Sequence, residues 1–98
     1  MSGQKAELDA NGERWAVTGS LIMDSVSALL HASAAQALPG AGIVDLAGVD
    51  RVDSAGVALL LAWQRRAAAE ERRLVFSSVP SSMASLAALY GVQELLAQ

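Results

Sequence analysis

Near the start of the chain, hydrophobic residues alternate with polar ones, and further along they recur at helical spacing, which predicts strands followed by helices. Residues 8–17 predict a hairpin, because the pair Asn11-Gly12 favours a tight turn whose two central residues both take a positive φ. The second strand of this hairpin is expected over residues 14–18 and is expected to end at Gly19.

A first helix is expected to start near Asp24 or Ser25 and to be stopped by Pro39-Gly40. The side chains expected to face the core from this helix are Val26, Leu29, Leu30 and Ala34. A short buried strand over residues 43–46 is expected next, followed by a polar turn that contains glycine.

The apolar segment after this turn predicts a helix over residues 55–69. Its first half is apolar around more than half of its circumference, which is wider than the stripe of an ordinary surface helix. Leu59 and Trp63 lie on one flank, and we expect both to belong to the core, with a hydrophobic contact to a partner as the alternative. Residues 70–73 are expected to be a solvated helix end.

Residues 74–76 predict another buried strand, and Ser81 or Ser82 is expected to cap a helix that Gly91 ends. The side chains of this helix expected to face the core include Met83, Leu86 and Tyr90, with the Tyr90 hydroxyl at an edge as the alternative. Residues 92–97 are expected to form a last short helix.

A hairpin followed by alternating helices and strands predicts an α/β fold with a mixed sheet, in which the strands after the hairpin are parallel. The length of 98 residues fits a single domain over residues 1–98. We expect the helices to pack mainly on one side of the sheet and residues 1–6 to be a flexible N-terminus.

Composition and charge exclude several classes of function. The net charge of −3 argues against binding nucleic acid, and the absence of cysteine excludes disulfides and thiolate metal sites. The longest apolar run covers residues 57–63, whereas a membrane-spanning helix needs about 20 residues, so we expect no direct membrane insertion. Residues 1–7 lack the apolar segment of a signal peptide, and a cytoplasmic location is expected.

The sequence carries no phosphate-binding loop, no dinucleotide fingerprint and no plausible catalytic triad, so we expect a protein that is not an enzyme and has no cofactor of its own. His31 is the only histidine, and it makes a poor metal ligand without a cysteine or a pair of carboxylates nearby. Asp45, Asp50 and Asp53 are close in sequence, but turn and cap chemistry explains the last two.

The most informative position is Ser54, a hydroxyl at the expected start of the helix over residues 55–69. Three interpretations are open for this residue: a helix N-cap, a contact with a partner, or an acceptor of phosphate. Asp53 is an alternative candidate for the cap. Ala55 and Gly56 are small, which allows a partner to approach closely.

The run Asp53-Ser54-Ala55-Gly56 resembles the STAS domain family, which places Asp, then Ser or Thr, then a small residue and Gly at the start of a helix. Within this family, the chain is similar to the cytoplasmic STAS subunits of phospholipid ABC transporters. The segments that carry this similarity are Val44-Asp45-Leu46, Arg51-Val52-Asp53, Ala58-Leu59-Leu60-Leu61 and Leu86-Ala87-Ala88-Leu89-Tyr90. The resemblance extends from about residue 15 to residue 96.

This resemblance implies an accessory subunit that binds and stabilises or regulates the transporter's ATPase subunit, which would hold the ATP and Mg²⁺. It implies indirect association with a permease and a periplasmic lipid-binding subunit, and so with the inner membrane, in a system that maintains outer-membrane lipid asymmetry. The residues expected to bind the partner are Asp53, Ser54, Ala55, Gly56 and Leu59. The alternative within the family is an anti-sigma-factor antagonist that a kinase switches by phosphorylating Ser54.

Overall fold

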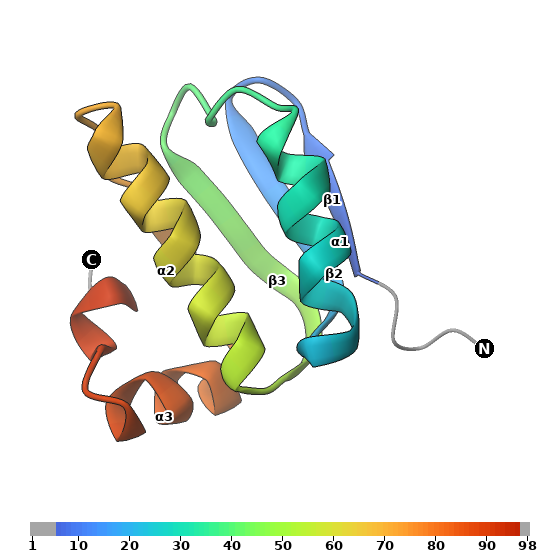
Figure 1. Cartoon of the computed structure of the whole chain (residues 1–98), viewed down its shortest axis with the longest axis vertical. Helices are drawn as coiled ribbons and strands as arrows, with labels where there is room; N and C mark the ends of the chain where they lie inside the picture. Colours follow the sequence, from blue (N-terminus) through green and yellow to red (C-terminus); the bar gives the residue numbers. More distant parts are fainter. Residues whose placement is uncertain (1–5, 97–98) are drawn as a thin grey trace.

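A four-stranded sheet with the strand order β1-β2-β3-β4 forms one layer of the computed structural model, which describes residues 6–96 (Figure 1). The elements in chain order are β1 (Ala6–Ala10), β2 (Arg14–Leu21), α1 (Met23–Ala34), β3 (Ile43–Val52), α2 (Ser54–Ala69), β4 (Val75–Ser77), α3 (Ser81–Leu89) and the 3₁₀ helix η1 (Gln93–Leu96). β1 is antiparallel to β2, whereas β2 with β3 and β3 with β4 are parallel. The predicted α/β fold with a mixed sheet is confirmed.

Helices α1 and α2 lie side by side over one face of the sheet, and α3 lies next to α2 (Figure 1). The core fills the space between this face and the helices. Trp15 of β2 and Trp63 of α2 meet there in a T-shaped arrangement with ring centroids 5.3 Å apart, and both side chains are buried. The prediction that Leu59 and Trp63 belong to the core is confirmed.

The hairpin between β1 and β2 forms where it is predicted, but by a different mechanism. Gly12 has a φ of 93°, whereas Asn11 does not adopt a positive φ. The side-chain oxygen of Asn11 instead accepts hydrogen bonds from the backbone N–H groups of Glu13 and Arg14, at 3.1 and 2.9 Å. The chain therefore turns over three residues, because an asparagine side chain can replace a backbone acceptor in a turn.

β3 is longer than the predicted strand over residues 43–46, because it continues through the expected polar turn to Val52. β2 likewise extends beyond Gly19 to Leu21, and Leu21 pairs with Val52. The register shifts at two places along this pairing, so the polar residues of β3 are accommodated by irregularities and not by a turn.

Helix α1 presents only part of the predicted face to the core, against which Val26 packs as predicted. Leu29 is buried, but Leu30 is 42% exposed and Ala34 is exposed as well. Ser33 takes the inward position, because its hydroxyl accepts a hydrogen bond of 2.9 Å from the indole N–H of Trp63. A polar contact between the two helices therefore decides the orientation of α1 near its C-terminal end.

The polar end of α2 is more than a solvated surface. Arg66 donates hydrogen bonds to the carbonyl groups of Ser33 and Gln36, and its guanidinium lies 5.9 Å from the ring centroid of Trp15. Arg72 donates to the carbonyls of Pro39 and Gly40 in the loop before β3. These arginines hold the connection between α1 and β3 against α2. The expected solvated end is confirmed for Glu70, Glu71 and Arg73, which are exposed, but not for Arg72, which is half-buried.

The ends of the described chain also bear on the predictions. Ala6 is the first residue of β1, while residues 1–5 of the expected flexible N-terminus lie outside the described residues. Met83 is buried and Leu86 partly buried, but Tyr90 is 51% exposed just after α3, so the expectation that it faces the core is wrong. Residues 93–96 form η1, and residue 97 of the predicted last helix lies outside the described part.

Candidate protein-docking site

Asp53 is the N-cap of α2, and it also holds the start of α1. One carboxylate oxygen accepts a hydrogen bond of 2.8 Å from the backbone N–H of Ala55, and the other accepts one of 3.1 Å from the backbone N–H of Met23. The carboxylate thus satisfies free N–H groups at both helix starts. Of the open interpretations, the cap belongs to Asp53 and not to Ser54. The partner contact of Asp53, which is half-buried, stays a prediction.

Replacing Asp53 with Ala is expected to lower the free energy of unfolding by about 1–2 kcal/mol, because N-cap substitutions cost about this much. Unfolding in urea measures the change. Asp50→Ala serves as the matched control, since Asp50 is an exposed aspartate of β3 outside this arrangement. Equal losses in the two variants would contradict the capping role.

Ser54 is the first residue of α2, and its side chain is exposed. Within residues 6–96, its hydroxyl makes no hydrogen bond to another protein group, because Asp53 occupies the capping position. The hydroxyl is therefore available on the surface, as partner contact and phosphate acceptance both require.

A hydrophobic groove lies beside Ser54. It is lined by Met23, Ser54, Ala55, Val57, Ala58, Leu61, Tyr90 and Val92. Met23 at the start of α1 is 73% exposed, and Leu89 and Tyr90 at the end of α3 are 75% and 51% exposed. Exposed apolar side chains that gather around a polar group are typical of protein-docking surfaces, where aromatic residues and methionine are enriched.

Two residues of the expected docking set lie inside the protein. Leu59 is 2% exposed, so it cannot offer a contact surface, and its expected role is corrected. Gly56 is buried as well, and a Cβ atom on it would lie 2.6 Å from the carbonyl oxygen of Leu21. Its small size serves the close packing of α2 on β2, and not the approach of a partner. Ala55 is half-buried and lines the groove.

Sequence reasoning missed the contributions of Met23 and Tyr90 to this site. Met23 stands 31 positions before Ser54, and only the fold brings the two together. For Tyr90 the sequence gives no signal either, because adjacent apolar residues of a helix can both be buried, as Leu59 and Leu60 of α2 are.

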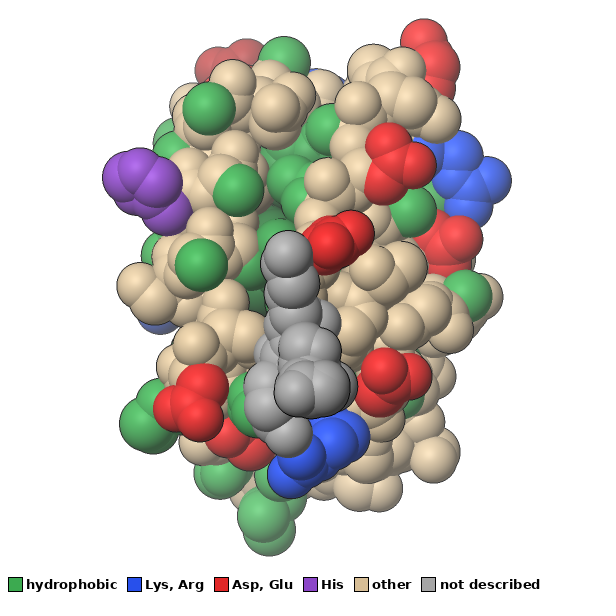
Figure 2. Space-filling view, turned by 90° about the vertical axis from the view of Figure 1, so that its right-hand side faces the viewer, with side chains coloured by type: hydrophobic (Ala, Val, Ile, Leu, Met, Phe, Trp, Pro, Cys, Tyr) green, Lys and Arg blue, Asp and Glu red, His purple; other side chains and the backbone are tan. Residues whose placement is uncertain are grey.

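A second groove on the described surface is lined by Leu61, Gln64, Ala68, Arg72, Arg73 and Glu94, together with residues 91–92. Figure 2 shows the side of the molecule that carries α1 and β1, where hydrophobic side chains are scattered among acidic and uncharged ones. Asp45 forms an ion pair of 3.6 Å with Arg14, and no group of three or more His, Asp or Glu among the described residues is placed to hold a metal ion. Over residues 6–96, no helix has the length and apolar character needed to cross a membrane.

Comparison with known proteins identifies the fold independently of this geometry. A family model described as "Mlab, STAS domain" matches residues 6–97, which is nearly the whole chain. No curated protein matches the chain.

Proposed function

Because the chain belongs to the STAS domain family, we propose that it is a non-catalytic subunit similar to MlaB, which binds and regulates the ATPase of a phospholipid ABC transporter. The observation that carries this proposal is the exposed Ser54 hydroxyl beside a groove lined by Met23 and Tyr90. The arrangement suits a polar contact beside an apolar surface. In this proposal ATP and Mg²⁺ belong to the ATPase.

Regulation of the ATPase would follow from a difference in the affinity of this subunit for two conformations of the ATPase. A subunit that binds one conformation of the ATPase more tightly than another shifts the population toward the first, and it needs no catalytic group to do so. The proposed complex also contains a permease and a periplasmic lipid-binding subunit, which would place this protein at the cytoplasmic side of the inner membrane. Its role would be to support lipid asymmetry of the outer membrane.

Ser54→Arg is expected to weaken binding of the ATPase encoded beside this chain's gene at least tenfold, because a long charged side chain would enter the groove. The measurement is the dissociation constant of the purified pair. Ser81→Arg is the matched control, since Ser81 is also an exposed serine at the first position of a helix. Equal affinities for both variants and for the wild type would refute the proposed interface.

The alternative function, an anti-sigma-factor antagonist, uses the same accessible hydroxyl. A phosphate on Ser54 would lie at the N-terminus of α2, where negative charge is favoured, and it would add about −1.5 to −2 charges beside the apolar groove. Incubation with a cognate anti-sigma kinase and ATP, followed by intact mass measurement, separates the two functions. Phosphate uptake by the wild type but not by Ser54→Ala would favour the alternative.

A further inference from the structure

Strand β1 forms an open edge of the sheet. It pairs with β2 on one side, and within residues 6–96 no strand lies on its other side. Edge strands present backbone N–H and C=O groups to the surroundings, and another polypeptide can extend the sheet by pairing with them. No residue of β1 lines the groove beside Ser54, so this edge is a surface separate from the proposed ATPase contact.

The register of the hairpin decides which backbone groups of β1 face outward. The backbone N–H of Asn11 donates a hydrogen bond of 3.2 Å to the carbonyl of Arg14. Hydrogen-bonded pairs alternate along an antiparallel ladder, so every second residue before Asn11 bonds to β2, while Ala10 and Leu8 direct their N–H and C=O groups away from it. Within residues 6–96, no other backbone group bonds to these two residues, and each offers one donor and one acceptor to an added strand.

The side chains of β1 alternate between an apolar face and an acidic face. Ala6, Leu8 and Ala10 are half-buried and pack against the core, whereas Glu7 and Asp9 are exposed. The two carboxylates occupy the positions between the outward-directed backbone groups, where the side chains of an added antiparallel strand would come closest. An added strand would therefore meet carboxylates on one face and apolar side chains on the other.

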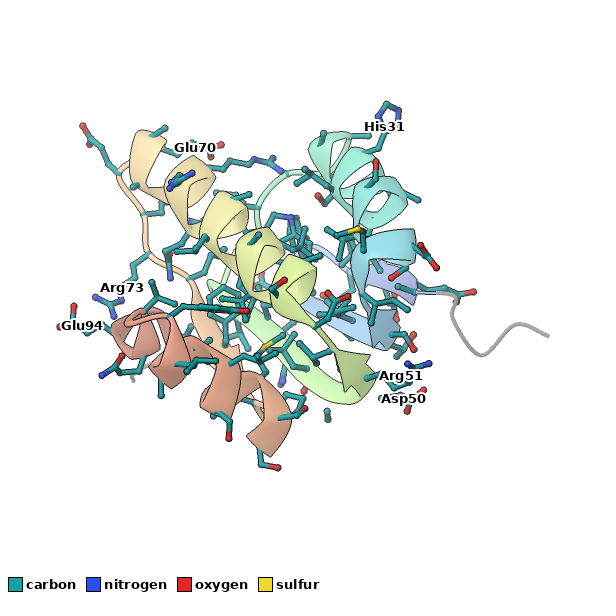
Figure 3. All side chains as sticks on the ribbon, turned by 60° about the horizontal axis from the view of Figure 1, so that its bottom comes forward. His31, Asp50, Arg51, Glu70, Arg73 and Glu94 are labelled. Carbon is teal, nitrogen blue, oxygen red and sulfur yellow. The ribbon has the colours of Figure 1, made fainter. Side chains whose placement is uncertain are left out.

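The charge around this edge is negative. Residues 6–50 contain six aspartates and glutamates but only one lysine or arginine, Arg14, which forms an ion pair with an aspartate of β3. Of the other arginines, Arg51 adjoins Asp50 on β3, and Arg73 lies far from α1, the helix that packs on β1 (Figure 3). Charge complementarity therefore favours an occupant that carries lysine or arginine.

A second copy of this chain is a poor occupant of the edge. Two β1 strands that pair antiparallel about Leu8 would place Glu7 of each copy opposite Asp9 of the other. Like charges directly opposite each other destabilise a strand pair, and charged side chains on an edge strand limit such self-association. The edge therefore disfavours a homodimer and favours a strand of opposite charge.

We propose that the open edge of β1 binds an extended segment of another protein in which lysine or arginine alternates with apolar residues. The segment adds a strand antiparallel to β1, and its backbone bonds to Leu8 and Ala10. Its basic side chains pair with Glu7 and Asp9, while its apolar side chains continue the core beside α1. This inference goes beyond the proposed function, because it requires neither Ser54 nor the ATPase.

Synthetic peptides test the edge on the full chain. The probe is a short peptide in which lysine alternates with valine. One control has glutamate in place of lysine, and the other has the same lysines and valines grouped in two blocks. Isothermal titration calorimetry is expected to show that the alternating lysine peptide binds at least about tenfold more tightly than either control, and less tightly at high salt. Equal affinities for the three peptides, or no binding of the alternating lysine peptide, would overturn the inference.

Substitutions in β1 test the charge and the backbone separately. Asp9→Lys is expected to weaken binding of the alternating lysine peptide at least about tenfold, because it replaces attraction with repulsion. Asp50→Lys is the matched control, since it makes the same change of charge at an exposed aspartate of β3, and its dissociation constant should stay within about twofold of the wild type. Ala10→Pro removes an outward N–H and no bond to β2, and it is also expected to weaken binding. Thermal unfolding verifies that each variant is folded, and equal affinities for Asp9→Lys and Asp50→Lys would contradict pairing at this edge.

Hydrogen exchange of the backbone amides locates the bound peptide. Saturating peptide is expected to slow exchange at Leu8 and Ala10, with no change in β4, the opposite edge of the sheet. Protection in β4 in place of β1 would overturn the inference. So would a dimer of the chain alone, seen by sedimentation, in which Leu8 and Ala10 are already protected, because the occupant would then be a second copy. ATPase binding is measured separately through Ser54→Arg, so either proposal can fail without the other.

Discussion

Trp63→Ala is expected to lower the free energy of unfolding by about 3–5 kcal/mol, which is a large part of the 5–15 kcal/mol typical of a single domain. The side chain is 1% exposed and packs edge-on against Trp15 at the centre of the core. Its removal leaves a cavity between α2 and the sheet, and it also removes the hydrogen bond to Ser33 that orients α1. Urea unfolding followed by Trp15 fluorescence measures the loss.

Trp63→Phe separates the two contributions of this residue. Phenylalanine retains an aromatic ring against Trp15 but has no N–H to donate to Ser33, so a loss of about 1–2 kcal/mol is expected. If Phe and Ala cost the same, the hydrogen bond and not ring packing would account for the stabilisation. A loss below about 1 kcal/mol for Trp63→Ala would contradict the central place of this ring.

The elements that could be predicted from the sequence are those with local signals. The start of α2 is an example, because a capping residue followed by an apolar helical run fixes it within one position. The extent of β3 could not be predicted in this way. Asp50 and Arg51 indicate a turn by composition, yet pairing with β2 and two register shifts keep them in the strand. This pairing is a tertiary effect that overrides local propensity.

The residues of the candidate site likewise include some that the sequence alone identifies and others that it does not. Ser54 was found from the sequence because its exposure follows from its place at the start of a helix. Leu59 was misassigned as a partner contact, because a helix that is apolar on most of its circumference does not reveal which side meets the sheet. Met23 was missed, since a residue of another helix joins the site only through the fold.

Placement of the site depends on how closely α2 approaches the sheet, and this depends on Gly56. A Cβ atom there would lie 2.6 Å from the carbonyl oxygen of Leu21 and 2.9 Å from a side-chain methyl of Val52. The same carbonyl accepts a hydrogen bond of 3.2 Å from the backbone N–H of Asp53. The end of β2 is thus bonded to the start of α2, so neither backbone segment can move away without loss of this contact.

Gly56→Val is therefore expected to lower the free energy of unfolding by about 1–3 kcal/mol, because the added side chain overpacks a buried position. It should also weaken ATPase binding, since the first turn of α2 must shift and carry Ser54 away from Met23 and Tyr90. Urea unfolding and the dissociation constant, measured on the same preparation, report the two effects.

Ala58→Val is the control for the unfolding measurement alone, because Ala58 is an exposed position of the same helix and its change carries the helix-propensity cost of valine without the clash, but it lines the groove. Gly56→Ala completes the series. Helix propensity alone predicts that this variant gains about 1 kcal/mol, whereas the contact with the Leu21 carbonyl predicts a loss. A gain in stability for Gly56→Ala would mean that α2 can move off the sheet without cost, and the position of Ser54 would then not depend on this glycine.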